Sequence, residues 1–463
     1  MIRYIIRSVF SLYAKRGSKL PIKIIFSNGS VYQNLPGTPQ ITIVFKNRRA
    51  EWRTLLFDYV GFMESYREQE IDIEGDDALR KLIRITYELN ARKKAKRNLN
   101  PLLWFRQRLL ESQNNNTSYL QTKINLYRHY NMPAEFFHLM TGELYGYTEG
   151  YYETGKETQD EAQFKKYDYI CRKLRLKKGD KVIEVGSAWG TMAMLMAKKY
   201  EADVVNYGLV EEQNRVMRER LKEKGLQDKV RIEVRDAREL KYEPEQYDKY
   251  VSLGVFEHAG KDCQREWVEA IATCLKPGGV GVMSMTGRMQ HGLIDYLIGK
   301  YIWFGCYLPS LANVMKLMEQ YDLHVVDIEN VRLHYAQTME VMLGKMLEHW
   351  PEIQKIDPEL FDEKFKRIWT MYYTGSIETL RLEGSTLQAY HLVFVKGRAD
   401  VYPRTRNFLY EKPYDTSEIS DYAVSFRKDD PMSAAAVLSR VEFNPTPPPM
   451  EVSNGTSRVP EKA

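Results

Sequence analysis

The spacing of apolar residues changes along this chain, and each change predicts a different kind of structure. Residues 20–75 hold short apolar runs, PIKIIFSNGSVY and ITIVFKN, separated by the breakers of NLPGTP, which predict strands and turns. A helix is expected after the acidic start GDD, with one apolar face formed by Leu79, Leu82, Ile83 and Leu89. These patterns predict a small accessory α+β domain over residues 1–100.

Residues 101–400 are expected to form the main domain. Helical segments are predicted from Pro101 to about residue 170, and strands and helices then alternate as a parallel sheet requires. Strands are expected at 181–185, 203–210, 230–236, 247–253 and 279–286, with a last pair around LHVVDIENV and YHLVFVKG. This order predicts an α/β fold, a Rossmann-like doubly wound sheet whose site residues gather at the carboxyl ends of the strands.

Beyond Val401 the periodic pattern ends, so residues 401–463 are expected to form an extension. Its last part, NPTPPPMEVSNGTSRVPEKA, is rich in proline and polar residues. A segment of this composition buries too little apolar surface to fold, and disorder is therefore expected at the end.

The first twenty residues combine an apolar stripe with basic residues. Ile2, Ile5, Ile6, Val9, Leu12 and Tyr13 fall at helical spacing, and the polar positions hold Arg3, Arg7, Lys15, Arg16 and Lys19. The segment lacks the uninterrupted apolar core and the cleavage site of a signal peptide. Two interpretations stay open: a basic amphipathic helix lying in a membrane interface, or a first helix packed on its own domain.

The net charge of +6 is unevenly distributed, with a second basic cluster, RKKAKR, at residues 92–97. Such a cluster attracts anionic lipid headgroups by roughly 1 kcal/mol per residue, and a solvated helix face is the other interpretation. No recognition motif accompanies the charge, so nucleic acid is not an expected partner. We expect a cytoplasmic protein, peripheral at the inner membrane surface, and the sequence leaves open whether it forms a homodimer.

The positions of the cysteines argue against a metal site, and the hydropathy argues against a transmembrane protein. Cys171, Cys263, Cys274 and Cys306 stand far apart, without a CxxC pair or a metal-ligand grouping with histidine, so no metal site is expected. No run of 18 apolar residues is present, and no transmembrane helix is predicted.

The most informative short motif is EVGSAWG at residues 184–190, between a predicted strand and a predicted helix at 191–199. Small residues at this place let backbone NH groups approach a ligand. A dinucleotide site needs GxGxxG, whereas Trp189 stands before the last glycine here, so NAD is disfavoured. An acidic residue such as Glu184, two positions before the first glycine, suits the amino group of S-adenosylmethionine.

Several further motifs, in their order along the chain, resemble the cyclopropane-fatty-acid synthase family. They are HYNMPAEFF (129–137), YGYTEGYYE (145–153), LRLKKGDKVIEVGSAWG (174–190), VSLGVFEHAG (251–260), LKPGG (275–279), KYIWFGCYLPS (300–310) and HYAQT (334–338). The resemblance covers about residues 125–400, and GFMESYREQEIDIEGD (61–76) is similar to the accessory amino-terminal domain of longer members.

The resemblance implies transfer of a methyl group from S-adenosylmethionine to the double bond of an unsaturated acyl chain in a phospholipid. Ring closure gives a cyclopropane fatty acid, and the same transfer can instead give a 10-methylene or methyl-branched chain. A lipid-binding scaffold without catalysis is the rival from a different class. The cofactor-binding positions implied for this chain are Tyr147, Thr148, Glu184, Gly186, Ser187, Ala188, Gln213, Asp236 and Ala237.

An alkene is a weak nucleophile, so such an enzyme has to align it, exclude water and tolerate a carbocation. Aromatic faces stabilise a desolvated cation by up to about 2 kcal/mol. Tyr335 is the first candidate, and the others are Tyr147, Tyr151, Phe256, Tyr301, Trp303 and Phe304.

The catalytic residues implied by the resemblance are Glu149, Glu257 and Tyr335. Typical members hold a bicarbonate ion as the base, with a cysteine, a glutamate, a histidine and a tyrosine. Glu257 and Tyr335 keep two of these positions, but Glu149 replaces the cysteine and the histidine position falls on Met283 or Ser284. Bicarbonate is therefore doubtful, and we hypothesise that Glu149 is itself the general base, with its pKa raised by Glu257 and burial. The alternative is a helix-cap or salt-bridge contact of Glu149.

Overall fold

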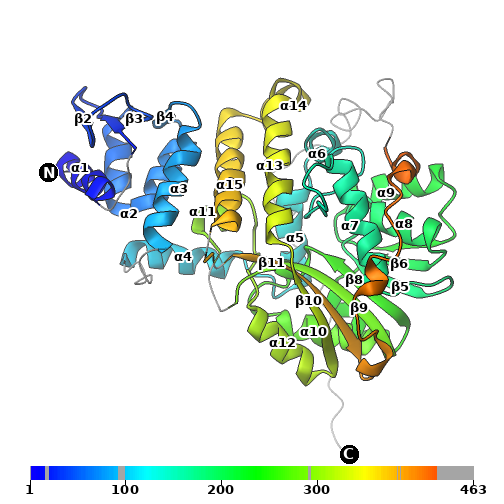
Figure 1. The fold of residues 1–463 in the computed structure, drawn as a ribbon. Coiled ribbons are helices and arrows are strands. Elements are labelled where there is room, and N and C mark those ends of the chain that lie inside the picture. Colours follow the sequence, from blue (N-terminus) through cyan, green and yellow to red (C-terminus); the bar gives the residue numbers. More distant parts are fainter. Residues whose placement is uncertain are drawn as a thin grey trace, which may run out of the picture. The chain divides into compact units, whose positions relative to one another are not determined.

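The centre of the protein is a sheet of parallel strands, shown in Figure 1 for the computed structural model: β5 (Lys181–Val185), β6 (Asp203–Tyr207), β7 (Val230–Glu233), β8 (Tyr247–Leu253) and β9 (Leu275–Gly287). Beside β9, β11 (Gln388–Lys396) runs antiparallel and pairs with β10 (Leu323–Asn330). Among the described residues the strand order is β10-β11-β9-β8-β5-β6-β7. The strands lie where the apolar runs predicted them, which confirms the expected α/β class.

The structure describes residues 2–15, 20–91, 100–289, 294–382, 384–385 and 387–424, without the side chains of 12–15 and 89–91. The basic cluster at residues 92–97, the face position of Leu89 and the predicted disordered end lie outside the described residues.

Alternate residues of the central strands point into apolar cores on opposite faces of the sheet. Ile183, Tyr250 and Met283 join one core with helices α10 (Gln264–Cys274) and α12 (Leu311–Gln320). The neighbouring residues Val182, Val251 and Val282 join the other, with α7 (Gln159–Lys173), α8 (Thr191–Lys199) and α9 (Glu211–Glu223). Burying each large apolar side chain contributes about 1.5–3 kcal/mol, which fixes the register of the strands.

The amino-terminal part forms a second sheet in the order β2-β1-β3-β4. Its strands are β1 (Ile22–Ile25), β2 (Val31–Gln33), β3 (Ile41–Phe45) and β4 (Ile71–Glu74), and α3 (Ala78–Ala91) follows as predicted. The expectation of strands and turns throughout residues 20–75 is wrong, because the long helix α2 (Arg48–Arg67) lies between β3 and β4.

The composition of α2 explains why its sequence did not predict a helix. Asn47 caps its first turn by accepting a hydrogen bond from the amide of Ala50. Asp58 then interrupts the helix at φ 51°, ψ −134°, and every residue from 60 to 65 is buried. A kinked helix that is buried on all sides after the kink shows no amphipathic period.

Helix α1 (Ile2–Lys15) packs on its own domain, in agreement with one of the two interpretations of the amino terminus. Ile2, Ile6 and Phe10 are buried. Arg3 forms an ion pair with Glu51 of α2 at 3.1 Å.

Ion pairs join the amino-terminal elements to helices of the main part of the chain. The α-helices not yet named are α4 (Pro101–Gln113), α5 (Tyr119–Tyr130), α6 (Ala134–Thr141), α11 (Tyr296–Tyr301), α13 (Arg332–Glu348), α14 (Trp350–Ile356) and α15 (Glu363–Arg381). Arg84 of α3 donates two hydrogen bonds, at 2.7 and 3.0 Å, to Glu378 of α15. Glu64 of α2 binds Arg106 of α4 at 3.0 Å and Lys300 of α11 at 2.7 Å. Residues 1–424 form one compact unit, and the boundary at residue 100 stays a prediction.

The described part of the extension, residues 401–424, folds back on the main domain in short 3₁₀ turns. Tyr422 is buried, and its carbonyl accepts a hydrogen bond from Arg220 of α9, which also binds the carbonyl of Trp189. Among the described helices, none combines the length and apolarity needed to cross a membrane. The four cysteines form no disulfide, and no group of metal-ligating residues occurs in the described ranges.

Candidate active site

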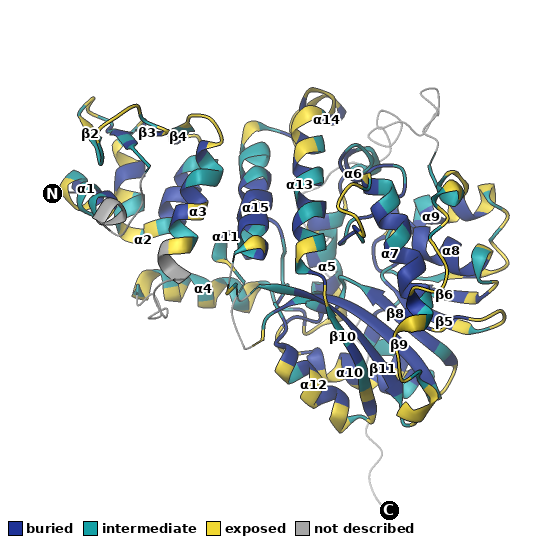
Figure 2. Cartoon of the chain, in the orientation of Figure 1, coloured by how far each residue is buried: buried dark blue, intermediate teal, exposed yellow. Residues whose placement is uncertain are grey.

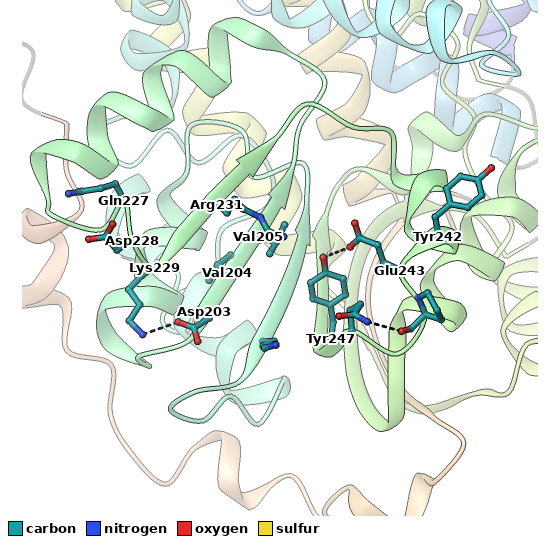
Figure 3. A pocket seen from close by; sticks show the side chains of 13 residues that line it. Asp203, Val204, Val205, Gln227, Asp228, Lys229, Arg231, Tyr242, Glu243 and Tyr247 are labelled. Carbon is teal, nitrogen blue, oxygen red and sulfur yellow. Dashed lines mark hydrogen bonds and ion pairs between the residues drawn. The ribbon is translucent and has the colours of Figure 1, made fainter.

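A cleft of about 660 Å³ opens at the amino ends of the parallel strands, and Figure 3 shows that charged side chains line it. Lys229 is paired with Asp203 at 2.8 Å, and the hydroxyl of Tyr247 donates to Glu243. These charged and polar groups already form ion pairs and hydrogen bonds with one another. In addition, the ligands of a doubly wound sheet bind at the opposite edge, where the carboxyl ends of the strands lie. This cleft is therefore not the candidate active site.

At the carboxyl edge, the EVGSAWG loop turns sharply from β5 into α8. Gly186 adopts φ 75° and Gly190 φ 90°, and Ala188 is also left-handed, at φ 51°. A Cβ atom on Gly186 would lie 2.7 Å from Cγ2 of Val255, so the loop passes close to the chain that follows β8. Glycine at position 186 is required both by the backbone conformation and by this approach.

Buried polar atoms without a protein partner gather around this loop. They are Oε2 of Glu184, Oγ of Ser187 and Nε2 of Gln213. Burial raises the pKa of Glu184 to about 8. Unpaired buried polar groups are costly in a folded protein, so this set indicates a ligand site. A carboxyl group beside an amide and a hydroxyl fits the ammonium and hydroxyl groups of S-adenosylmethionine.

The other residues predicted to bind the cofactor lie on both sides of the loop. The hydroxyl of Thr148 accepts a hydrogen bond from Lys166 at 2.9 Å. Asp236 caps the short 3₁₀ helix η1 (Ala237–Tyr242), and each of its carboxylate oxygens accepts a hydrogen bond from the Arg238 guanidinium at 2.8 Å. A cofactor group bound there would share oxygens that already bind Arg238, and the cofactor-binding role of Asp236 stays a prediction.

Glu149 is buried, and one of its carboxylate oxygens is held by two donors. Oε1 accepts hydrogen bonds from Oγ of Ser284 at 2.6 Å and from Nε2 of His391 at 2.8 Å. Burial alone would raise the pKa of Glu149, but His391, Lys166 and Ser284 outweigh burial, and the pKa is lowered. The expectation of a raised pKa at Glu149 is therefore wrong, and its salt-bridge alternative is observed as the pair with His391.

His391 also corrects the expectation that the site lacks a histidine. It lies on β11 and pairs in register with Ser284 of β9, one of the two positions, with Met283, on which the missing histidine was expected to fall. The imidazole therefore comes from the antiparallel neighbour strand. Only the pairing of β9 with β11 reveals this, although a histidine inside the apolar run YHLVFV was a visible signal.

Glu257 lies on the 3₁₀ turn η2 (Phe256–Ala259) that follows β8. Its Oε1 accepts a hydrogen bond from the amide of Thr286 at 2.5 Å, and its Oε2 is buried without a partner. Burial, together with the charge of Glu149, raises the pKa of Glu257 to about 7, although the hydrogen bond from Thr286 opposes the shift. The raised pKa expected at Glu149 thus occurs at Glu257. A pair of carboxyl groups with pKa values pushed apart is typical of acid–base sites.

The third predicted catalytic residue, Tyr335, lies on α13 and interacts electrostatically with both Glu149 and Glu257. Burial raises its pKa well above 10, so the phenol stays protonated and can donate a hydrogen bond. The structure therefore brings together all three side chains that the resemblance implied to be catalytic.

An aromatic wall adjoins these groups, and its members are His129, Tyr130, Tyr147, Trp303 and Tyr372. The ring of His129 stacks on Trp303 at 3.9 Å, and its Nε2 lies 3.2 Å from the hydroxyl of Tyr147. Of these five, Tyr147 and Trp303 were predicted, whereas His129, Tyr130 and Tyr372 were missed because helical aromatics are more often core residues.

Four of the predicted aromatic candidates have their ring contacts elsewhere. Tyr151 stacks on Tyr169, and Phe256 packs against Trp267 in the core below the sheet. Tyr301 and Phe304 each lie under an arginine guanidinium, at 4.4 and 5.4 Å from the ring centroid. These four residues therefore do not belong to the aromatic wall formed by the His129 group.

Lys166 was not predicted, yet it connects the two halves of the site. Its ammonium group is buried and interacts with the charges of both Glu149 and Glu184. Burial lowers the pKa of Lys166 to about 8. A lysine within an amphipathic helix gave no sequence signal for this position.

Comparison with known proteins places these features in context. The sequence profile described as mycolic acid cyclopropane synthetase matches residues 117–389. The "Probable fatty acid methyltransferase" of Pseudomonas putida is 32% identical over 61% of this chain and 72% of its own length. The cyclopropane-fatty-acyl-phospholipid synthase of Escherichia coli K12 is 30% identical over 58% and 67%. The solved cyclopropane synthase MmaA2 of Mycobacterium tuberculosis has the same fold, with 22% identity and a TM-score of 0.54 over 59% of this chain and 98% of that chain.

Proposed function

This chain belongs to the mycolic acid cyclopropane synthetase family, and from that premise we propose that it transfers a methyl group from S-adenosylmethionine to the double bond of an unsaturated phospholipid acyl chain. The product proposed first is a cyclopropane fatty acid. One observation carries the proposal: Glu149, Glu257 and Tyr335 meet behind an aromatic wall, next to the orphaned polar atoms of the EVGSAWG loop.

S-adenosylmethionine bound at that loop supplies an electrophilic methyl group. Glu184 would hold its ammonium group, and Ser187 and Gln213 would satisfy further polar groups of the cofactor. Tyr147 and Trp303 face the acyl chain in the proposal, and their ring faces stabilise the positive charge that develops on the chain after transfer by up to about 2 kcal/mol. The buried setting of these groups excludes the water that would otherwise trap that charge.

Glu149 is the base of the proposed reaction. Its ionised carboxylate accepts a proton from the transferred methyl group, and the electron pair of the broken C–H bond forms the third side of the ring. His391 and Ser284 hold the carboxylate in place and keep it ionised. Glu257, with a pKa of about 7, passes between its protonated and ionised forms near neutral pH and can return the proton to solvent.

The groups around Glu149 do not fit a bicarbonate ion. The donors His391 and Ser284 already bind Glu149, and the neighbouring Glu257 adds a second acidic group. An anion placed between two carboxyl groups would be repelled unless both were protonated. The proposed reaction therefore uses no bicarbonate.

A second product, the 10-methylene branched chain, is favoured by one observation. The base belongs to the protein and is fixed on one side of the site by His391. After a 1,2-hydride shift has moved the positive charge to the carbon that carries the new methyl group, this carboxylate can take a proton from that methyl group, and the electron pair of the broken C–H bond forms the C=CH2 double bond. Whether the proton is removed before or after the hydride shift would then decide between ring and branch.

The test is incubation of an unsaturated phospholipid extract with methyl-labelled S-adenosylmethionine, followed by mass and proton spectra of the fatty acids. A gain of 14 mass units with cyclopropane protons supports the ring, and vinylidene protons support the branch. Absence of label in any lipid would contradict both products and leave the scaffold interpretation. The expected location is the inner membrane surface, where the acyl substrate is found.

A further inference from the structure

Helix α4 presents an apolar face to solvent. Leu102, Phe105 and Leu109, at positions i, i+3 and i+7, are 53%, 64% and 47% exposed, and Trp104 beside them is 61% exposed. No residue of α4 is buried, and Figure 2 shows the helix in the colours of exposed and intermediate residues. A helix on the surface of a water-soluble protein normally turns polar residues outward. Here the outward face is the apolar one.

Helix α5 continues this surface. Leu120 and Ile124, one turn apart, are 64% and 38% exposed, and Arg128 follows at the next turn of the same face. Arg128 donates a hydrogen bond to Asn114, the residue that ends α4, so the two helices meet there. The apolar positions of α4 and α5 together form what we call the α4–α5 surface. Exposed apolar side chains on two helices that meet in this way are typical of an interaction site.

Basic residues border the α4–α5 surface. The guanidinium of Arg108, which also pairs with Glu111 at 3.7 Å, lies 5.5 Å from the centroid of the Trp104 ring, and the ammonium of Lys123 lies 5.8 Å from that of Tyr127. Aromatic rings beside arginine and lysine, with aliphatic residues between them, are typical of the interface between lipid headgroups and acyl chains. The positive border is complementary to anionic headgroups.

A cavity of about 310 Å³ opens beside the same helix. Arg128 lines it together with His129, Met132, Ile368 and Trp369. The ring of His129 also stacks on Trp303 of the aromatic wall. The cavity, which Arg67, Glu359 and Asp362 also line, thus lies between Arg128 at the end of the α4–α5 surface and His129 of the aromatic wall.

We propose that the α4–α5 surface docks the protein on an anionic phospholipid bilayer, with the cavity beside Arg128 turned toward the lipid. This inference rests on the proposed function, because a bilayer is the source of an unsaturated phospholipid chain. A second copy of the chain is the competing occupant. The bilayer is favoured because like-charged borders would face each other in a symmetric dimer, whereas anionic headgroups neutralise them.

The experiment is co-sedimentation of the full chain with vesicles of phosphatidylcholine alone and with 30% phosphatidylglycerol, a composition chosen to vary only the surface charge. The triple variant Leu102→Ser, Phe105→Ser, Leu109→Ser is expected to bind the anionic vesicles at least about tenfold more weakly, since binding scales with the apolar area inserted. Its control, Tyr242→Ser, Met315→Ser, Leu347→Ser, removes three exposed apolar side chains elsewhere and should bind as the parent does. Arg108→Gln with Lys123→Gln should reduce the preference for anionic vesicles.

Activity separates this inference from the proposed function. Methyl transfer by the triple variant should fall about tenfold on vesicles and stay within about twofold on the same lipid dispersed in detergent. Loss of methyl transfer by the parent chain on both forms would overturn the proposed function and leave the vesicle-binding result standing. Unchanged vesicle binding by the triple variant overturns the docking surface. The docking surface is also overturned if the parent chain is a dimer, the triple variant is a monomer, and the two bind vesicles equally.

Discussion

Nε2 of His391 lies 2.8 Å from Oε1 of Glu149, although 242 positions separate the two residues in the sequence. Both side chains are almost fully buried, with exposed fractions of 1% and 3%. The pair gives Glu149 a lowered pKa in a place where burial alone would protonate it. A carboxylate that remains ionised away from water is suited to accept a proton.

Replacing Glu149 by glutamine should lower kcat by at least about 10²-fold, because the amide cannot accept the proton. Binding of S-adenosylmethionine, measured by calorimetry, should change little. Ser284→Ala keeps the carboxylate and should cost less than tenfold. Adding bicarbonate to the parent enzyme in carbonate-free buffer should have no effect, and a strict requirement for it would contradict the assignment of Glu149 as the base.

Replacing His391 by glutamine should move the acid limb of the pH–kcat profile to higher pH. The ion pair with His391 lowers the pKa of Glu149, so its loss lets the pKa rise, and the ionised base is then lost at a higher pH as the solution is acidified. The amide of glutamine can still donate a hydrogen bond, which keeps the site folded. A uniform drop in kcat with an unshifted profile would indicate a purely structural role.

Binding of S-adenosylmethionine should strengthen as pH rises from about 6 to 8. The pKa of Glu184 is about 8 in the free protein, so most of its carboxyl groups are protonated at pH 7, and the cationic cofactor favours the ionised form. Calorimetry in two buffers of different ionisation enthalpy should therefore detect proton release on binding. Glu184→Gln should bind more weakly and lose the pH dependence attributable to this carboxyl group.

Gly186→Ala should abolish cofactor binding, whereas Gly179→Ala should not. Both glycines have a left-handed backbone, at φ 75° and 79°, so both substitutions carry a strain of about 1–2 kcal/mol. A Cβ at 186 would also meet Val255 at 2.7 Å, while nothing lies within 4 Å of one at 179. The difference between the two variants in cofactor affinity and melting temperature, measured by calorimetry and thermal melting, therefore gives the effect of the contact with Val255 alone.

Glu64→Gln should destabilise the protein by about 3 kcal/mol, because it leaves Arg53, Arg106 and Lys300 without their shared carboxylate. These cations lower the pKa of Glu64 to about 2, despite burial, from an ordinary value of 4.5. The stabilisation is thus fully present above about pH 4.5 and is lost as the pH falls toward 2. Urea unfolding at pH 7 measures the effect, with the surface variant Glu352→Gln as the control.

The main sheet could be predicted from the sequence because its strands are short, mainly apolar runs that alternate with helices, and the central ones, such as β5 and β11, are mostly buried. The cofactor loop could be located because glycine is needed at its sharp turns. Helix α2 could not be predicted, since its kink at Asp58 and its burial on all sides remove the helical period.

The candidate site, like the fold, could be predicted only in part. Glu149, Glu257 and Tyr335, which the structure brings together, were predicted as catalytic from motifs that keep their order along the chain. His391 and Lys166 were missed because their roles depend on strand register and on the packing of α7, which connect residues remote in sequence. The direction of the pKa shift at Glu149 was wrong for the same reason, since the donor that lowers it was not known.

Arg220 binds the carbonyl of Trp189, within the EVGSAWG loop, and the carbonyl of Tyr422, near the end of the described chain. The extension therefore helps to hold the cofactor loop in position through Arg220. A truncated protein that ends before residue 422 would lose the carbonyl that accepts a hydrogen bond from the buried guanidinium of Arg220. Weak cofactor binding by such a truncated protein would then reflect the missing extension and not the catalytic domain itself.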